Sequence, residues 1–257
     1  MNDIIKKILA IIVLKIKEDG LNSLVKSPLF RMRKMFYVLY LRVNLKNLNK
    51  RYTSESLVNF ALSYGEHLIH PKQVRSEILN LIQILKKERP KFILEIGTAS
   101  GGTLFLFSKI AAKDAVLISI DLPGGKYGGG YPEWKIPLYK SFALPKQRII
   151  LIREDSHEKS ALNKVKKILN GKKLDYLFID GDHTYEGVKN DFEIYSPLVK
   201  DGGLIAFHDI VIHPPELNVG VHDFWNEINP RYEYLEIVED WNQKFCGIGL
   251  LKNTLKN

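Results

Sequence analysis

Two short stretches, FIDGDHTYEG and FHD, combine aspartate with histidine at the ends of apolar runs. Their acids and histidines are Asp180, Asp182, His183, His208 and Asp209. Carboxylate oxygens and imidazole nitrogens are side-chain atoms that hold divalent cations, and a neutral imidazole can also take a proton near neutral pH. A buried carboxylate without a partner is costly. Both stretches are therefore candidates for a functional site.

These acids differ in what else could explain them. A calcium-binding loop does not fit DGDHTYE, because Tyr185 stands where that loop requires glycine and no acid closes it. Asp182 and Thr184 directly precede a helical pattern and could cap that helix, and we favour this role for Asp182. Asp180 and Asp209 each end a buried run, where an unused carboxylate is hard to explain.

Five apolar runs form the pattern that must position these residues. Each run ends in polar residues or glycine, and the runs are 92–97, 116–121, 149–153, 174–180 and 203–209. Continuous runs of this kind are typical of parallel strands that are buried on both faces. Helical patterns separate most of them, over 101–112, 157–169 and 185–199. The sequence therefore predicts an α/β fold with a doubly wound, mostly parallel open sheet and right-handed crossovers.

Further elements flank this alternating pattern. A short helix is expected from Thr53 to about Tyr64, and a second is expected to begin at Pro71 and to end before Pro90. The carboxyl-terminal patterns predict one helix and two strands, over 220–228, 232–238 and 245–251.

The doubly wound arrangement places the fourth and fifth strands side by side. Asp180 then comes within reach of His208 and Asp209 at the carboxyl edge of the sheet, where α/β proteins bind ligands. Two carboxylates and an imidazole on rigid strands could hold a divalent metal, with water or substrate oxygens completing its coordination.

A glycine-rich turn follows the first strand. The strand ends in EIGTASGGT, in which glycines at 97, 101 and 102 allow a sharp turn and a close approach of a ligand to the following helix N-terminus. The spacing lacks the G-x-G-x-x-G of dinucleotide sites, which argues against hydride transfer. A tight turn without a ligand is the alternative on these residues alone.

Two more acids close neighbouring strands at the same edge. Asp121 ends the second strand, in position to accept hydrogen bonds from ribose hydroxyls. Asp155 follows the third strand, in position to accept from the exocyclic amine of adenine. Either acid alone is more simply a helix cap or a solvated loop residue. Together with the glycine turn they outline an adenosine site.

The series LEIGTASGG, SIDLPGG, EDS, FIDGDHTYEG and GGLIAFHD resembles class I S-adenosylmethionine-dependent methyltransferases. The resemblance covers about residues 70–251 and is closest to the branch of metal-dependent sugar O-methyltransferases and cephalosporin hydroxylase-like proteins. It implies a seven-stranded sheet in the order 3-2-1-4-5-7-6, with helices on both faces and a closing antiparallel hairpin. The residues that it implies for binding S-adenosylmethionine are Glu95, Gly97, Thr98, Gly101, Gly102, Asp121, Asp155 and Ser156.

The same resemblance implies roles for His183 and for the two strand ends. His183 matches the general base of the metal-dependent relatives, and Asp180, His208 and Asp209 occupy the positions of their metal ligands. The relatives have an acid pair where this chain has His208 followed by Asp209. The resemblance implies Mg or Mn as the metal, whereas an imidazole ligand favours Mn, Fe or Zn over Mg.

The activity implied is an S-adenosylmethionine-dependent O-methyltransferase, metal-assisted, that methylates a hydroxyl of a sugar, glycolipid or secondary metabolite. Methyl transfer needs an oxygen whose proton has been removed, which a cation and His183 would together achieve. Loop 122–134, rich in glycine and aromatic residues, suits a lid over the acceptor or a plain linker. Two alternatives stay open: an iron-dependent hydroxylase using His183, His208 and Asp180, and a non-catalytic membrane- or partner-binding protein on the same fold.

The net charge of +9 lies entirely in the first 51 residues. This segment holds twelve Lys and Arg against three Asp and Glu, which leaves 38 − 12 = 26 basic and 29 − 3 = 26 acidic residues in 52–257. A neutral body is not expected to bind nucleic acid. The chain therefore divides into a basic amphipathic extension, residues 1–51, and one S-adenosylmethionine-binding domain, residues 52–257.

The extension contains two apolar runs, 8–14 and 35–41, flanked by Lys or Arg and too short to span a bilayer. They suit helices lying on an anionic membrane surface, and equally a helical cap packed on the domain or on a second subunit of a homo-oligomer. The one cysteine, Cys246, is expected in the core and fits a reducing compartment. We expect a cytoplasmic protein, in peripheral contact with the inner membrane face if the first role holds.

Overall fold

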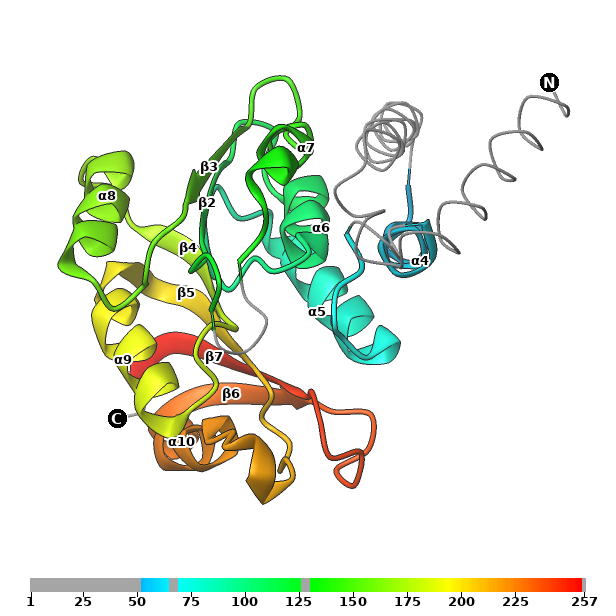
Figure 1. Cartoon of the computed structure of the whole chain (residues 1–257), viewed down its shortest axis with the longest axis vertical. Coiled ribbons are helices and arrows are strands. Elements are labelled where there is room, and N and C mark those ends of the chain that lie inside the picture. The colour runs from blue at the N-terminus through cyan, green and yellow to red at the C-terminus, as the bar shows by residue number, and fades with distance from the viewer. Residues whose placement is uncertain (1–51, 65–68, 126–129, 256–257) are drawn as a thin grey trace, which may run out of the picture. The chain divides into compact units, whose positions relative to one another are not determined.

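The computed structural model describes residues 52–64, 69–125 and 130–255 (Figure 1). The predicted basic extension, residues 1–51, lies outside the described residues, and its membrane and partner roles stay predictions. Within the described ranges, no helix combines the length and the apolar character needed to cross a membrane.

A seven-stranded sheet forms the centre of the described domain. Its strand order is β3-β2-β1-β4-β5-β7-β6, which confirms the predicted order. The strands are β1 (Phe92–Ile96), β2 (Val116–Ile120), β3 (Arg148–Ile152), β4 (Leu174–Ile179), β5 (Val199–His208), β6 (Tyr232–Ile237) and β7 (Ile248–Leu255). The first five strands are parallel, and β7 runs antiparallel to both β5 and β6. All five central carboxyl ends therefore meet at one edge.

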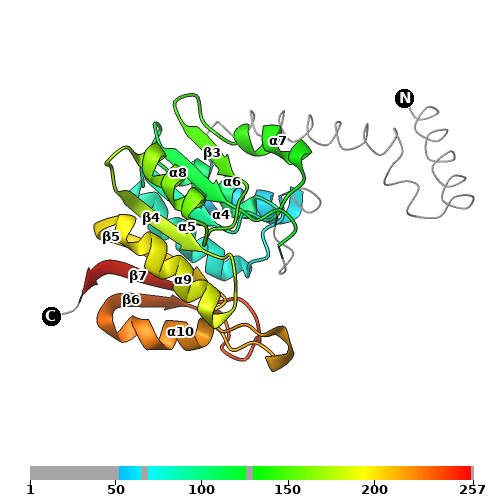
Figure 2. The same ribbon diagram turned by 60° about the vertical axis from the view of Figure 1, so that its left-hand side comes forward.

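Helices precede the first strand and connect the later ones. They are α4 (Ser54–Asn59), which continues as a π-helical turn (Phe60–Tyr64), α5 (Arg75–Glu88), α6 (Gly102–Ile110), α7 (Ile136–Lys140), α8 (Lys159–Leu169), α9 (Tyr185–Tyr195) and α10 (Val221–Ile228). Figure 2 shows α8 and α9 on one face of the sheet and α5 and α6 on the other. The predicted layers, with helices on both faces, are confirmed.

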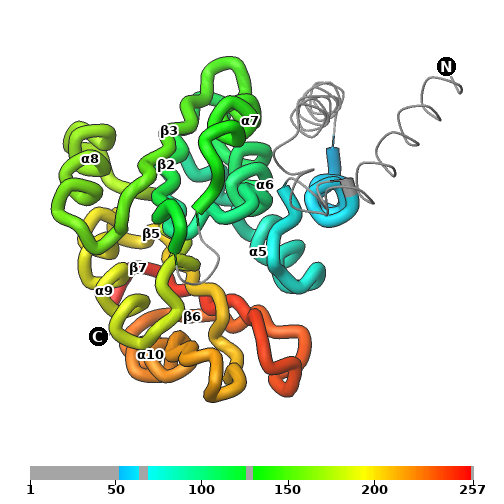
Figure 3. The backbone as a smooth tube through the Cα atoms, in the orientation of Figure 1, coloured from blue at the N-terminus to red at the C-terminus, as the bar shows by residue number. Residues whose placement is uncertain are grey.

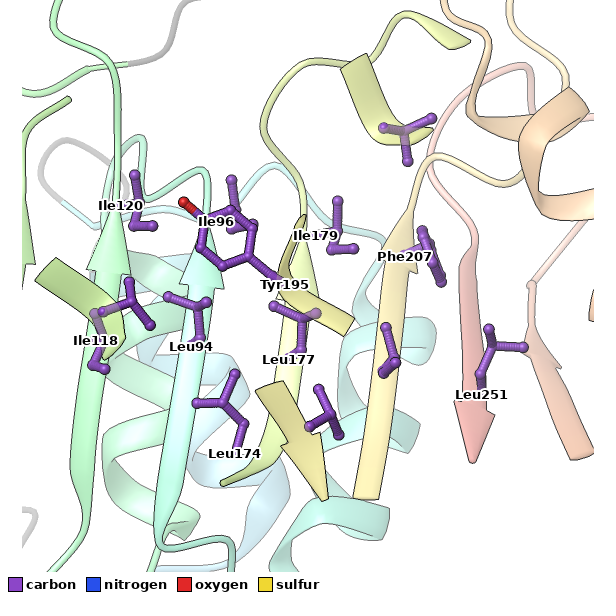
Figure 4. Packing of buried hydrophobic residues seen from close by; sticks show 14 of the residues in the cluster. Leu94, Ile96, Ile118, Ile120, Leu174, Leu177, Ile179, Tyr195, Phe207 and Leu251 are labelled. Atoms are coloured by element: carbon purple, nitrogen blue, oxygen red, sulfur yellow. The ribbon is translucent and has the colours of Figure 1, made fainter. Parts of the chain in front are cut away.

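The core divides between these two faces because side chains alternate along each strand. On one face, Leu94 and Leu177 pack with Tyr195 of α9 (Figure 4). On the other, the Phe107 ring of α6 lies edge-on to Tyr176, with 5.3 Å between ring centroids. Burial on both faces explains why the strands read as continuous apolar runs.

Several element boundaries differ from the sequence predictions: β5 begins at Val199 rather than at 203, α9 ends at Tyr195 rather than at 199, and two further differences lie beside the cavity. Helix α5 begins at Arg75 rather than at Pro71, because Val74 is extended at the helix N-cap and residues 70–73 contain a bend and line the cavity described below. Strand β7 begins at Ile248 rather than three residues earlier, because Cys246 and Gly247 have positive φ values of 62° and 83°. Figure 3 traces this connection, in which the chain leaves β6 through a loop and returns along β7.

The β6–β7 loop, residues 238–247, is held by a buried carboxylate on α5. Glu77 is 1% exposed, and its oxygens accept backbone hydrogen bonds from Glu239 at 3.0 Å and from Gly247 at 2.9 Å. The side chain of Gln243 donates to the same carboxylate at 2.8 Å. Three charge-assisted hydrogen bonds compensate for the burial of this acid and fix the loop against α5.

Candidate functional site

A cavity of about 1000 Å³ lies at the carboxyl ends of the parallel strands. Its wall includes ten of the predicted site residues, which are Gly97, Thr98, Gly102, Asp121, Asp155, Ser156, Asp180, His183, His208 and Asp209. The two predicted residues absent from the wall are Glu95 and Gly101. Residues far apart in the sequence are therefore brought to one place, as the doubly wound topology requires.

The glycine turn needs glycine at the point where it passes β4. Gly97 has a φ of +91°, and a β-carbon on it would lie 1.8 Å from the main-chain oxygen of Asp180. Gly101 caps α6 with a φ of +85°. Only glycine adopts such conformations freely, so the β1–α6 turn can lie close to the end of β4.

Glu95 stabilises this turn from inside the protein and does not reach the cavity. Its side chain is fully buried and accepts hydrogen bonds from Thr103 at 2.5 Å and from Ser119 at 2.8 Å. Burial raises the pKa of the Glu95 carboxyl to about 8. Buried in this way, the Glu95 carboxyl is placed to position the turn, and the predicted contact of Glu95 with the cofactor stays a prediction.

Asp121 connects the glycine turn to the segment after β2. Its Oδ2 accepts the Ala99 N–H at 2.6 Å, and its Oδ1 accepts the Gly130 N–H at 2.7 Å. Burial raises the pKa of the Asp121 carboxyl above its ordinary value. Residues 126–129 of the predicted lid lie outside the described part of the chain, so the lid role stays a prediction.

The segment after β3 contains a histidine that sequence reasoning left aside. Asp155 is partly exposed and accepts the His157 N–H at 2.9 Å. The His157 ring lines the cavity with its Nε2 3.3 Å from Oδ1 of Asp191, a fully buried acid of α9. The hydrogen bond to Asp191 raises the pKa of His157 to about 9, against the opposing effect of burial.

The ends of β4 and β5 bring the predicted metal ligands together. The two strands pair in parallel register with Ile179 opposite Phe207. His208 Nδ1 lies 3.1 Å from Oδ1 of Asp180 and 3.2 Å from Oδ1 of Asp209. The adjacency expected from the topology is therefore observed.

His183 lies between the two carboxylates. Its Nδ1 is 2.8 Å from Oδ2 of Asp209, and its Nε2 is 3.3 Å from Oδ1 of Asp180. Thr184 caps α9 by accepting the Gly187 N–H at 3.0 Å, and Asp182 accepts the Thr184 N–H at 3.0 Å. Asp182 therefore stabilises the beginning of α9, and His183 lines the cavity.

The electrostatics of this cluster favour charged imidazole. Burial disfavours the charged ring of His183, but hydrogen bonds to Asp180 and Asp209 outweigh burial and raise its pKa to about 10. Burial likewise opposes ionisation of Asp209, yet the adjacent His208 holds the pKa of that carboxyl well below its usual range. A cation would compete with these protons for the same atoms.

Three further residues reach the cluster from outside the strand ends. Gln73 donates to Oδ2 of Asp180 at 3.4 Å, and His213 places Nε2 3.2 Å from Oδ1 of Asp209. Cys246 is buried, as predicted, but it also lines the cavity beside His208. The sequence patterns missed these roles because they predict a helix at Gln73 and a strand at Cys246, whereas both residues precede the observed elements, and because His213 lies in a loop, where no periodic pattern fixes its position.

The donors fit a divalent cation. Ligand atoms that lie within 4.8 Å of one another form two sets that share Asp209: one with Asp180 and His183, the other with His208 and Cys246. His208 is 5% exposed, and among the described residues neither of its ring nitrogens has a hydrogen-bond partner. The His208 ring lies close enough to Asp180 and Asp209 for ion pairs, but its nitrogens are not oriented for hydrogen bonds to them. A bound ion between these groups would explain this arrangement.

Residues 94–210 match the model of a family described as a methyltransferase domain. An uncharacterised protein of Acanthamoeba polyphaga mimivirus is 33% identical over 130 residues, which are 51% of this chain and 56% of that protein. An uncharacterised protein of Sinorhizobium fredii is 30% identical over 148 residues, which are 54% of this chain and 15% of that protein. The chain therefore spans less than two thirds of the length of either relative.

Solved structures share the fold over most of the chain. The O-methyltransferase TomG from Streptomyces achromogenes, in complex with SAM, has a TM-score of 0.52 and 16% identity, covering 83% of this chain and 96% of TomG. An O-methyltransferase from Bacillus cereus, in complex with SAH, has a TM-score of 0.52 and 15% identity, covering 83% of this chain and 97% of the other. Likeness at these identities shows a common fold.

Proposed function

We propose that this chain is a methyltransferase of the class I fold, which transfers the methyl group of S-adenosylmethionine to a hydroxyl oxygen with the help of a divalent cation. One observation carries this proposal: a single cavity is lined both by the glycine turn with Asp121 and by the cluster of Asp180 and His183. The proteins of the same fold that hold SAM or SAH support the choice of cofactor.

The cofactor would be held on the β1–β3 side of the cavity. The Asp121 carboxylate lines the cavity and already accepts the Ala99 and Gly130 N–H groups, and it would also accept from a ribose hydroxyl. The partly exposed Asp155 can accept from the exocyclic amine of adenine. These roles divide the adenosine between two neighbouring strand ends.

The acceptor would be held on the β4–β5 side. In the transfer, a lone pair of the acceptor oxygen forms the bond to the methyl carbon, and the electrons of the carbon–sulfur bond leave with sulfur. His183 takes the hydroxyl proton in this scheme, because it lies at the cavity wall beside Asp180. A divalent cation held by Asp180, His208 and Asp209 would lower the pKa of the hydroxyl and that of the His183 ring.

The cavity entrance supports an acceptor with an apolar part. Leu122, Leu217 and Phe245 line the cavity and are 44%, 51% and 54% exposed. Exposed apolar side chains that line a site favour a ligand with an apolar part that covers them. Among the predicted acceptors, a glycolipid or an apolar secondary metabolite fits this entrance better than a free sugar.

Calorimetry with S-adenosylmethionine and the full chain tests the cofactor assignment. We expect binding that is retained when a chelator is added, whereas transfer of a labelled methyl group to hydroxylated lipids and aromatic compounds should stop. A chain that binds no S-adenosylmethionine would exclude the methyltransferase and leave the non-catalytic alternative. Transfer that survives the chelator and Asp180→Asn would exclude the cation.

A further inference from the structure

His213 makes the hydrogen bond that is typical of a metal-binding histidine. Its Nδ1 lies 2.8 Å from the main-chain oxygen of Val211, which can only accept, so Nδ1 carries the proton. In the neutral ring, Nε2 then presents a lone pair, and this atom lies 3.2 Å from Oδ1 of Asp209. Histidines that bind metals usually donate their other N–H to a carbonyl in this way.

His208 supplies a second ring nitrogen that could bind an ion. The ring is 5% exposed and neither nitrogen is hydrogen-bonded to any residue that the structure describes, although Nδ1 lies 3.1 Å from Oδ1 of Asp180. A buried polar atom without a partner destabilises the folded protein. An ion beside Nδ1 would remove this destabilisation.

Asp209 lies close to both histidines: its Oδ1 is 3.2 Å from Nδ1 of His208 and 3.2 Å from Nε2 of His213. Asp209 has a φ of +66°, a left-handed conformation that non-glycine residues rarely adopt. Its Oδ1 accepts the Cys246 N–H at 3.0 Å, and the Cys246 thiol lies within 4.8 Å of donor atoms of His208 and Asp209. A soft sulfur atom therefore lies beside the same carboxylate.

We propose that this cluster is a nitrogen-rich metal centre, in which His213 and His208 join Asp180 and Asp209 as ligands. Such a donor set selects ions of the Zn²⁺ and Fe²⁺ class over Mg²⁺ and Ca²⁺, because imidazole suits the former and all-oxygen sites suit the latter. This inference rests on the cation of the proposed function, specifies which class of ion it is, and assigns His213 as one of its ligands. It concerns metal binding alone, so it can fail while methyl transfer stands, and the reverse.

Metal titration of the full chain, stripped of metal and studied without cofactor, tests the proposal. We expect Zn²⁺ to bind at least about a hundredfold more tightly than Mg²⁺. His213→Ala should weaken Zn²⁺ binding about 10- to 100-fold and leave Mg²⁺ binding unchanged. His208→Asp, which replaces nitrogen by oxygen, should reduce the ratio of Zn²⁺ to Mg²⁺ affinity.

His222→Gln is the matched control. The Nδ1 of His222 also faces a main-chain oxygen, that of Ile210, but its ring does not line the cavity. X-ray absorption of the Zn²⁺-loaded wild-type chain should show two imidazole ligands, a measurement that does not depend on whether a variant folds. Three results would overturn the proposal: equal affinities for Zn²⁺ and Mg²⁺, fewer than two imidazole ligands in the absorption spectrum, or equal effects of His213→Ala and His222→Gln on Zn²⁺ binding. Each would leave His213 as an ion-pair partner of Asp209.

Discussion

Gly97, which follows β1, lies against the main-chain carbonyl of Asp180, which follows β4. A β-carbon at Gly97 would be 1.8 Å from that oxygen. The turn that would face the cofactor and the acid that would face the cation are therefore in direct backbone contact.

Gly97→Ala should be severely destabilising, because the added β-carbon meets backbone and the residue keeps a φ of +91°. We expect a loss of at least about 4 kcal/mol in the free energy of unfolding. Gly171→Ala is the control, since Gly171 has a φ of +79° but open space around its β-carbon position. It should cost about 1–2 kcal/mol in denaturant unfolding. Similar losses in both variants would contradict the contact.

Asp121→Asn should weaken S-adenosylmethionine binding about 10- to 100-fold, because hydrogen bonds to a charged acceptor are worth roughly 1.5–3 kcal/mol. Calorimetry measures this change directly. Asp223→Asn removes a charge from an exposed position on α10 and should leave the affinity unchanged. An unchanged affinity for Asp121→Asn would remove Asp121 from the cofactor site.

His183→Ala should lower kcat by about 10²- to 10⁴-fold, the usual contribution of a general base. The affinities for cofactor and for metal should stay within a few-fold, because Asp180 and Asp209 remain. Single-turnover methyl transfer, read together with metal titration, separates the two roles. A parallel loss of metal affinity would show that His183 acts as a ligand rather than as a base.

The pair of His157 and Asp191 should make stability depend on pH in the alkaline range. The His157 ring has two acidic neighbours: its Nε2 lies 3.3 Å from Oδ1 of Asp191, and its Nδ1 lies 3.8 Å from Oδ1 of Asp155. The pKa of His157 is raised from 6.5 to about 9. A raised pKa gives stability that is complete below pH 6.5 and lost as the pH rises through 9.

Because the His157 ring is partly exposed, this loss should be about 1–2 kcal/mol. Thermal unfolding of wild type and Asp191→Asn across this range measures it, since other titrating groups are common to both proteins. The gap between the two proteins should narrow as the pH rises. A gap that stays constant would show that the pair does not titrate.

Sequence reasoning located the five parallel strands to within one to four residues because each is a continuous apolar run. Strand β2 illustrates this: the run 116–121 compares with the observed Val116–Ile120. The same alternation implied which strand ends meet, and so brought Asp180 to His208. Both inferences depend on regular periodicity, which the sequence displays directly.

The sequence could not place residues whose position depends on distant contacts. Glu95 reads as a strand-end acid beside a glycine turn, yet its side chain lies beneath the turn with Ser119. His213 and Cys246 reach Asp209 only through the folding of two loops. No local sequence pattern predicts these contacts, because the positions of loop residues are set by tertiary contacts and not by the periodicity of a helix or strand.

The carboxylate of Glu77 on α5 bonds to partners that the ribosome adds much later. Glu239 and Gly247 lie 162 and 170 residues further along the chain. Contacts between residues so far apart form late, since a long loop must close before they are made. A growing chain can therefore contain all five parallel strands while Glu77 is still solvated and the wall formed by Phe245 and Cys246 is missing. The cavity is completed only after the β6–β7 loop has emerged, so this acid links the order of synthesis to the moment at which ligands can be enclosed.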